Sequence, residues 1–272
     1  MNPAPEKEGK VLCDLHAHPT HRASLERIIA ALKSPGMVGL TVKDIDKSGK
    51  DILRYEQALD LLPAKSFQEL DKGRLAKCGQ GYFARTQEIQ AGFHHVLALG
   101  WKGSHYFPNF DTIEEAVREI HAYKGVAILN HPFALVIGRN NIRLPKSHEE
   151  KELIRRAYSH VDEVEVHNAY CIDLIPKILA MKEANRQAEE LRHQEFPSFV
   201  GTAGSDCHRR WNQVKTTGIY LSRSCIDQKG MEGIKEAIIY GNFIRLGDSD
   251  AGPYVSRGGF LLGVVSDMIS LL

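Results

Sequence analysis

The 272-residue sequence has little surplus charge and no closely spaced cysteines. Lys and Arg number 35 against 34 Asp and Glu, a formal net charge of +1, so nucleic acid is possible as a partner but is not indicated. The cysteines form no Cys-x-x-Cys pair, which favours free thiols in a reducing, cytoplasmic compartment. They are Cys13, Cys78, Cys171, Cys207 and Cys225.

Long apolar runs are also missing. Residues 1–10 are polar and lack the apolar segment of a signal peptide, so we expect a loosely held N-terminus there. The apolar run 259–272 is too short to span a bilayer and contains Asp267, so we expect no membrane span. We predict that residues 251–272 form a terminal helix packed on the body of the protein, with membrane contact or a dimer interface as alternatives. No feature of the sequence predicts an oligomeric state.

The remaining composition is that of a globular protein, with 43% hydrophobic and 25% charged residues. Short apolar runs, such as Met37–Val42 and Val126–Asn130, alternate with helical patterns along the chain. This alternation predicts βα units around a parallel sheet, and the length suits one α/β barrel over residues 11–250. A capping-box spacing at Ser66–Glu69 predicts one more short helix. Asp111 and Thr112 are both predicted as possible caps of the helix that follows them.

The motif Asp14-Leu15-His16-Ala17-His18 ends the first predicted strand. Because side chains alternate along a strand, His16 and His18 point to the same face. Two neutral imidazoles on one face can bind one metal ion of the zinc type. His-x-His pairs are common on protein surfaces, so this pair alone is weak evidence.

Other polar residues fall at or beside predicted strand ends, which is where a (β/α) barrel places its active site. Histidine and carboxylate ligands suit zinc, manganese or iron, and Glu88 has two oxygens with which to bridge two ions. A pair of ions can clamp the attacking and leaving oxygens of a displacement at phosphorus, and a metal lowers the pKa of water to about 7. The candidate ligands are His16, His18, Glu88, His95, His131, Asp206 and His208.

In this order along the chain, the motifs resemble those of the polymerase and histidinol phosphatase (PHP) family of metal-dependent phosphoesterases. The matching segments are Asp14-Leu15-His16-Ala17-His18, Glu88 with His95-Val96-Leu97-Ala98-Leu99-Gly100, Asn130-His131-Pro132-Phe133, Val164-Glu165-Val166 with Asn168, and Gly204-Ser205-Asp206-Cys207-His208.

The resemblance implies a distorted TIM-like (β/α)7 barrel and a hydrolase that cleaves a small phosphorylated substrate with two or three divalent ions. It implies one ion on His16, His18, Glu88 and Asp206, and a second on Glu88, His95 and His131. His208 would serve a third ion or the substrate phosphate. In catalysis, Glu88 would bridge the ions, Asp206 would orient the nucleophile and His208 would assist the leaving group.

Two departures from the family pattern affect the third ion. The family's Thr-Asp-His-Asp motif aligns with Thr41-Val42-Lys43-Asp44, so Lys43 replaces a histidine, and Pro19–Ala23 lacks the usual carboxylate. His21, Asp44 or His167 would have to compensate, or Lys43 occupies the place of that ion. Lys43, Arg22 and Arg139 are our candidates for phosphate binding.

Two other functions fit the same residues. Amidohydrolase-like barrels, which hydrolyse amides and lactones, also carry His-x-His, later histidines and a terminal Asp; here Glu88 replaces their carboxylated lysine. A PHP-like scaffold that binds metal without catalysis is the other alternative, since third-site ligands are missing. Glu165 either lines the site or is an ordinary strand residue.

Overall fold

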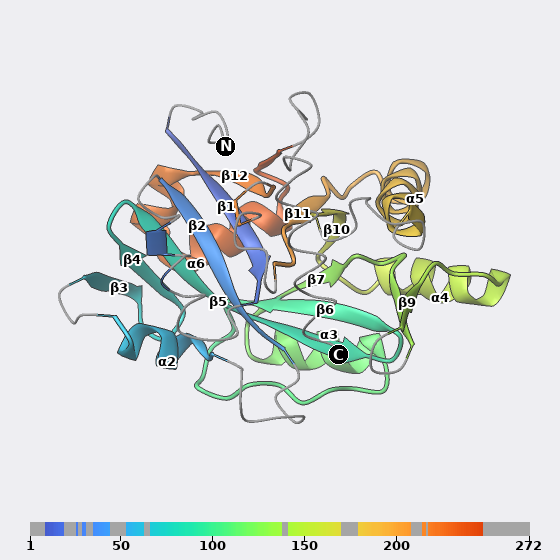
Figure 1. The fold of residues 1–272 in the computed structure, drawn as a ribbon, viewed down its shortest axis with the longest axis horizontal. Coiled ribbons are helices and arrows are strands. Elements are labelled where there is room, and N and C mark those ends of the chain that lie inside the picture. The colour runs from blue at the N-terminus through green and yellow to red at the C-terminus, as the bar shows by residue number, and fades with distance from the viewer. Residues whose placement is uncertain are drawn as a thin grey trace.

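A ring of seven strands forms the centre of the fold in this computed structural model (Figure 1). Neighbouring strands pair in the order β11-β10-β7-β6-β5-β2-β1. The ring nearly closes after β11, where Cys207 forms a β-bridge with Ala17 and the Asp206 amide donates to the His16 carbonyl over 2.7 Å. The strands of the ring are β1 (Lys10–Ala17), β2 (Gly36–Lys43), β5 (Gly81–Ala91), β6 (His94–Leu99), β7 (Val126–Asn130), β10 (Glu163–Asn168) and β11 (Thr202–Gly204).

The structure describes residues 9–18, 26, 29–30, 35–43, 53–62, 66–137, 141–169, 179–207, 214–215 and 217–246. The predicted terminal helix at 251–272 and most of the N-terminal segment lie outside these ranges. The further strands are β3 (Phe67–Asp71), β4 (Leu75–Cys78), β8 (Leu135–Ile137), β9 (Asn141–Arg143), β12 (Ile219–Ser222) and β13 (Ile244–Arg245). The helices are α2 (Tyr55–Asp60), α3 (Ile113–Ala122), α4 (His148–Tyr158), α5 (Leu179–Glu195) and α6 (Arg223–Ile239).

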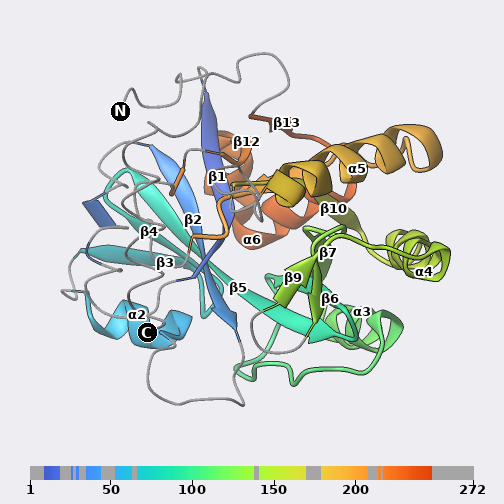
Figure 2. The same cartoon turned by 45° about the vertical axis from the view of Figure 1, so that its right-hand side comes forward.

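The predicted α/β barrel is confirmed: a nearly closed, barrel-shaped sheet carries helices on its outside. Figures 1 and 2 show α4 and α5 on one side of the barrel and α2 on the opposite side. None of the helices in the described ranges is long and apolar enough to cross a membrane.

The prediction of a parallel sheet is wrong at β6, which pairs antiparallel with both β5 and β7. The cause is the connection between β5 and β6, which consists of Gly92 and Phe93 alone. Two residues can join antiparallel strands but cannot make the crossover between parallel ones. Gly92 has a φ of +61°, the left-handed conformation that tight hairpin turns require. The antiparallel β6 therefore begins at the rim where β5 and β7 end.

The helix predicted at Ser66–Glu69 is also wrong, because Phe67–Asp71 form strand β3. This strand pairs antiparallel with β4 across a turn that contains Gly73 at a φ of +69°. A capping box involves only four residues. Here the pairing of β3 with β4 outweighs this local preference and gives a strand. β4 in turn pairs with β5, so the hairpin extends the barrel sheet.

Apolar side chains on both faces of the strands hold the barrel together. Along β6, Val96 and Ala98 pack with the helices α3 and α4, while Leu97 and Leu99 belong to a second cluster that includes α6. This alternation is the period of two expected for a strand buried on both faces. Of the two predicted capping residues of α3, Thr112 is the cap, with its hydroxyl accepting from the Glu115 amide over 3.3 Å.

Candidate metal centre

The predicted polar residues meet at one rim of the barrel, near the carboxyl ends of β1, β5 and β7. His16 belongs to the end of β1, Glu88 to β5, and His131 directly follows β7. His95 reaches the same rim because β6 is antiparallel, so its start lies opposite Gln90 and Asn130 near the ends of its neighbours.

The first cluster consists of His16, His18 and Asp206, all buried. The Nε2 atoms of the two histidines lie 3.0 Å apart. Asp206 Oδ1 is 3.5 Å from His16 Nε2 and 3.3 Å from His18 Nε2. Glu88 borders this cluster, with an oxygen 3.5 Å from His16 Nε2 and another 3.6 Å from His18 Nε2.

The second cluster consists of Glu88, His95 and His131, also buried. Glu88 Oε1 lies 2.9 Å from His95 Nδ1 and 3.2 Å from His131 Nε2. Oε1 is thus shared by the rings of the second cluster, whereas Oε2 lies toward His18 of the first. Glu88 stands between the two clusters, in the position that a bridging carboxylate needs.

The distances in both clusters fit divalent ions. Ligands at about 2.1 Å from a tetrahedrally coordinated ion lie roughly 3.4 Å from one another. The distances among the ligand atoms of His16, His18 and Asp206 run from 3.0 to 3.5 Å. In the second, His95 Nδ1 is buried 2.9 Å from a carboxylate oxygen without forming a hydrogen bond to it. A cation held there would satisfy His95 Nδ1.

The contacts behind the two β1 histidines fix which nitrogen faces the cluster. His18 Nδ1 donates to the Thr41 carbonyl over 3.1 Å, and His16 Nδ1 lies 3.1 Å from Glu165 Oε1. A carbonyl or carboxylate oxygen accepts a proton, so in neutral rings both Nε2 atoms carry lone pairs. Two lone pairs held 3.0 Å apart repel each other unless a metal ion or a proton lies between them. This arrangement favours metal binding, and such outer contacts are typical of metal-ligating histidines.

Charges at the centre favour an ionised Glu88. Burial by itself raises a carboxyl pKa, but the His95 and Lys43 charges and hydrogen bonds from His131 and His16 outweigh it and hold the pKa of Glu88 well below its usual range. Burial lowers the pKa of His95, whereas at His16 and His131 the neighbouring carboxylates outweigh burial and raise the pKa. The Lys43 ammonium adds a charge that does not depend on the protonation of any histidine.

The backbone is strained at two of the candidate ligands. His131 has a φ of 29° and Asp206 a φ of 48°, in the left-handed region that residues other than glycine rarely occupy. Such conformations cost of order 1–3 kcal/mol each and concentrate at functional sites. His131 directly follows β7, and Asp206 directly precedes the bridge residue Cys207, so the barrel holds both in place.

Glu165 lines the site, which resolves the alternative left open by the sequence. Its Oε1 contacts His16, and its Oε2 accepts from the His131 amide over 3.2 Å and from Asn168 Nδ2 over 2.9 Å. One carboxylate thus supports a residue of each cluster. Gly204 makes room for it, since a Cβ there would lie 2.3 Å from Glu165 Oε1.

We expect Glu165→Gln to weaken metal binding by about 10-fold or more, the usual effect of losing an outer carboxylate behind a histidine ligand. Isothermal titration of the metal-free protein with Mn²⁺ or Zn²⁺ would measure it. Glu163→Gln is the matched control, because Glu163 lies on the same strand and accepts from the backbone amides of 164, 200 and 201 instead. The control should lower the melting temperature and keep metal affinity; equal affinities in both variants would contradict the role of Glu165.

Asp14 and Lys43 lie beside the two clusters, whereas five further candidates lie outside the described residues. Asp14 accepts from the amides of Ser205 and Lys215, so it supports the backbone beside the first cluster, and burial raises its pKa to about 6. Lys43 reaches Glu88. The candidates outside the described residues are His208, Arg22, Arg139, His21 and Asp44.

Sequence reasoning did not assign a role to Asn130, which is buried with its Nδ2 3.5 Å from both His16 Nε2 and Glu88 Oε1. Its position directly before His131 in the Asn-His-Pro-Phe motif is the sequence feature from which its place in the site could have been predicted. The Thr41 carbonyl that orients His18 has no signal in the sequence, because any residue supplies a carbonyl.

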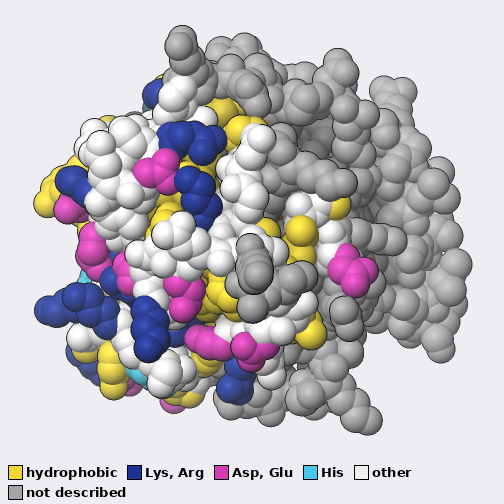
Figure 3. Space-filling view, turned by 90° about the vertical axis from the view of Figure 1, so that its left-hand side faces the viewer, with side chains coloured by type: hydrophobic (Ala, Val, Ile, Leu, Met, Phe, Trp, Pro, Cys, Tyr) yellow, Lys and Arg dark blue, Asp and Glu magenta, His cyan; other side chains and the backbone are white. Residues whose placement is uncertain are grey.

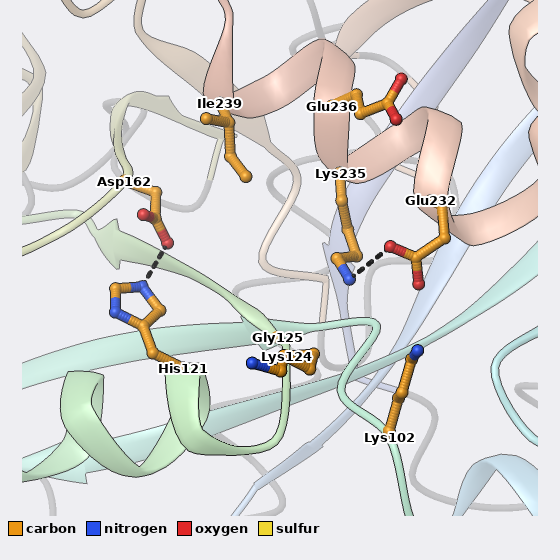
Figure 4. A pocket seen from close by; sticks show the side chains of 9 residues that line it. All are labelled: Lys102, His121, Lys124, Gly125, Asp162, Glu232, Lys235, Glu236 and Ile239. Carbon is orange, nitrogen blue, oxygen red and sulfur yellow. Dashed lines mark hydrogen bonds and ion pairs between the residues drawn. The ribbon is translucent and has the colours of Figure 1, made fainter.

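A separate cavity of about 460 Å³ lies at the other end of β7, next to Gly125 (Figure 4). Its charged residues are largely paired with one another: His121 lies 2.8 Å from Asp162, and Lys235 lies 2.8 Å from Glu232. No candidate ligand lines this cavity, so its residues contribute nothing to the metal centre.

Comparisons with known proteins were made by sequence and by structure. No family model and no curated protein sequence matches the chain. Solved structures do match. A two-domain protein from Bacteroides vulgatus containing a predicted PHP-like metal-dependent phosphoesterase matches with a TM-score of 0.53 and 16% identity, over 89% of this chain and 66% of that one. The chain has the fold of the PHP-like phosphoesterases.

Two further solved structures share this fold over most of the chain. PsfC from Pseudomonas syringae matches with a TM-score of 0.56 and 15% identity, over 97% of this chain and 100% of that one. The lesion-specific endonuclease EndoQ from Pyrococcus furiosus matches with a TM-score of 0.51 and 16% identity, over 87% of this chain and 57% of that one. The chain thus spans about two thirds or less of the Bacteroides and Pyrococcus proteins. The resemblance predicted from the motifs is confirmed at the level of the fold.

Proposed function

We propose that this protein is a hydrolase that cleaves a phosphate ester with two divalent ions. The observation that carries the proposal is the position of Glu88, whose carboxylate lies within 3.6 Å of histidines of both clusters. We assign His16, His18 and Asp206 with Glu88 to one ion, and Glu88, His95 and His131 to the other. Zinc, manganese and iron all suit these nitrogen and oxygen donors.

Bound divalent ions supply charge that polarises a phosphoryl oxygen and lowers the pKa of water to near neutrality. The chain's own residues then position the reaction. Asp206 reaches both clusters, because its Oδ1 faces the β1 histidines while its Oδ2 lies 3.9 Å from His131 Nε2. We assign it the orientation of the nucleophile. We keep His208 as the residue that assists the leaving group.

We propose a small phosphorylated compound as the substrate. The Pyrococcus neighbour is described as a lesion-specific endonuclease, which makes nucleic acid the competing class. Duplex binding needs a basic surface that follows the phosphate backbone. On the face shown in Figure 3, the described Lys and Arg side chains are interspersed with Asp and Glu side chains instead. Around β3 and β4, Arg74 pairs with Asp71 and Lys77 with Asp227.

A cytoplasmic location remains part of this proposal. Cys13, Cys78 and Cys207 are buried free thiols, which fits a reducing compartment.

A substrate panel would test the function. The protein would be stripped with a chelator, reloaded with Mn²⁺, Zn²⁺ or Fe²⁺, and assayed on phosphomonoesters, phosphodiesters, amides and lactones. We expect metal-dependent turnover of phosphate esters only. Turnover of amides or lactones would favour the amidohydrolase alternative, and bound metal without any turnover would favour the inactive scaffold.

A further inference from the structure

Lys43 is the last residue of β2 and lies beside Glu88 on the neighbouring strand β5. The two residues are partners in the parallel register, so their side chains leave the sheet on the same face. The Lys43 ammonium lies 2.7 Å from Glu88 Oε2, the oxygen on the side of His18. The register of β2 therefore places a positive charge against the carboxylate that stands between the two clusters.

The exposure of the two side chains differs. The Glu88 side chain is 0% exposed, whereas that of Lys43 is 30% exposed. The Lys43 side chain is thus partly open to solvent, while its ammonium contacts a carboxylate that is fully buried.

The local charge explains why an ammonium suits this position. Glu88, Asp206 and Glu165 are three carboxylates within contact distance of His16. A lysine supplies a permanent charge and up to three donors, but it cannot ligate a metal while it keeps its proton. At Oε2 it competes with a cation for the carboxylate, and toward solvent it attracts an anionic oxygen.

We propose that Lys43 binds an anionic phosphoryl oxygen of the substrate beside Glu88, as a fixed ammonium in the place of a further metal ion. This role rests on the proposed function for its substrate class. It narrows that class to phosphate esters with a charged, unesterified oxygen exposed next to the bridging carboxylate. The ammonium makes the centre complete with two ions per chain.

Binding measurements can test this role without turnover. Inorganic phosphate would be titrated into the Mn²⁺-loaded protein, and Mn²⁺ into the metal-free protein, for the wild type and the variants Lys43→Met and Lys43→Arg. We expect Lys43→Met to weaken phosphate binding by about 10-fold, as for the loss of one charged hydrogen bond. The same variant should bind Mn²⁺ more tightly, because a repelling charge is gone.

Lys43→Arg should keep both affinities within about threefold, since the charge remains. Lys77→Met is the matched surface control: the Lys77 side chain is 33% exposed and pairs with Asp227 at 3.3 Å, and exposed pairs contribute little. Weaker phosphate binding together with tighter Mn²⁺ binding distinguishes loss of the Lys43 charge from local distortion, because distortion would weaken both affinities. Loss of both affinities in Lys43→Met, unchanged phosphate affinity, or no phosphate binding by the metal-loaded wild type would each overturn the proposal.

These outcomes separate the inference from the proposed function. A wild type that hydrolyses no phosphate ester, but shows the opposite shifts in Lys43→Met, would refute the hydrolysis and keep the anion-binding role. If the wild type hydrolyses phosphate esters while Lys43→Met leaves phosphate affinity unchanged, the proposed hydrolysis is kept and the anion-binding role of Lys43 is refuted.

Discussion

Glu88→Gln is expected to lower phosphoesterase turnover by about three orders of magnitude, the upper end of the loss seen when one electrostatic group is removed from an active site. Glu88 is the carboxylate of the second cluster, and it also borders the first. An amide keeps the shape but loses the charge that two cations would share. It also leaves the Lys43 ammonium without its 2.7 Å carboxylate partner.

The measurement is turnover of the substrate found in the panel, at saturating Mn²⁺, together with circular dichroism and thermal melting. Glu232→Gln is a suitable control, because Glu232 is a carboxylate at the opposite end of the barrel, paired with Arg74 and Lys235. The control should retain activity. A folded Glu88→Gln variant with near wild-type turnover would remove Glu88 from the mechanism.

His16→Ala and Asp206→Ala are each expected to reduce the bound metal from two ions per chain to about one. The two residues lie near opposite ends of the described chain, yet their ligand atoms are 3.5 Å apart. Removing a first-cluster ligand leaves His95 and His131 with Glu88 in place, so the second ion should remain. Elemental analysis after dialysis would give the stoichiometry.

His94→Ala serves as the control for this experiment. His94 is buried next to His95, but its side chain leaves β6 on the other face of the strand. It should keep both ions even if its stability falls. Unchanged metal content in both the His16 and Asp206 variants would disprove the assignment of these residues to one ion.

Much of the fold and of this cluster could be predicted from local patterns. The His-x-His pair needs only the alternation of a strand, and apolar runs ending in polar residues located Glu88, His131 and Asp206 at strand ends. The barrel followed from the alternation of strands and helices. These signals are strong because each depends on fewer than about ten neighbouring residues.

The direction of β6 and the identity of β3 could not be predicted in the same way. Both depend on strand pairing across a short turn: β5 with β6 at Gly92, and β3 with β4 at Gly73. Capping signals and hydrophobic periodicity contain no information about which strands pair. The contacts of Lys43 and Glu165 are non-local as well. The distance from Lys43 to Glu88 follows from the β2–β5 register, and Glu165 meets His16 only because residue 204 has no side chain.

The place where the ring closes also sets an order of assembly. Glu88, His95 and His131 come from the consecutive strands β5, β6 and β7, so their cluster can form from one short stretch of chain. His16 and His18 must wait for Asp206, which the bridge between Ala17 and Cys207 holds beside them. During synthesis from the N-terminus, the ribosome must release nearly the whole described barrel before this second half can close. If the proposed two-ion centre is correct, a nascent chain would complete the second cluster first and the first cluster only after β11 has joined the ring.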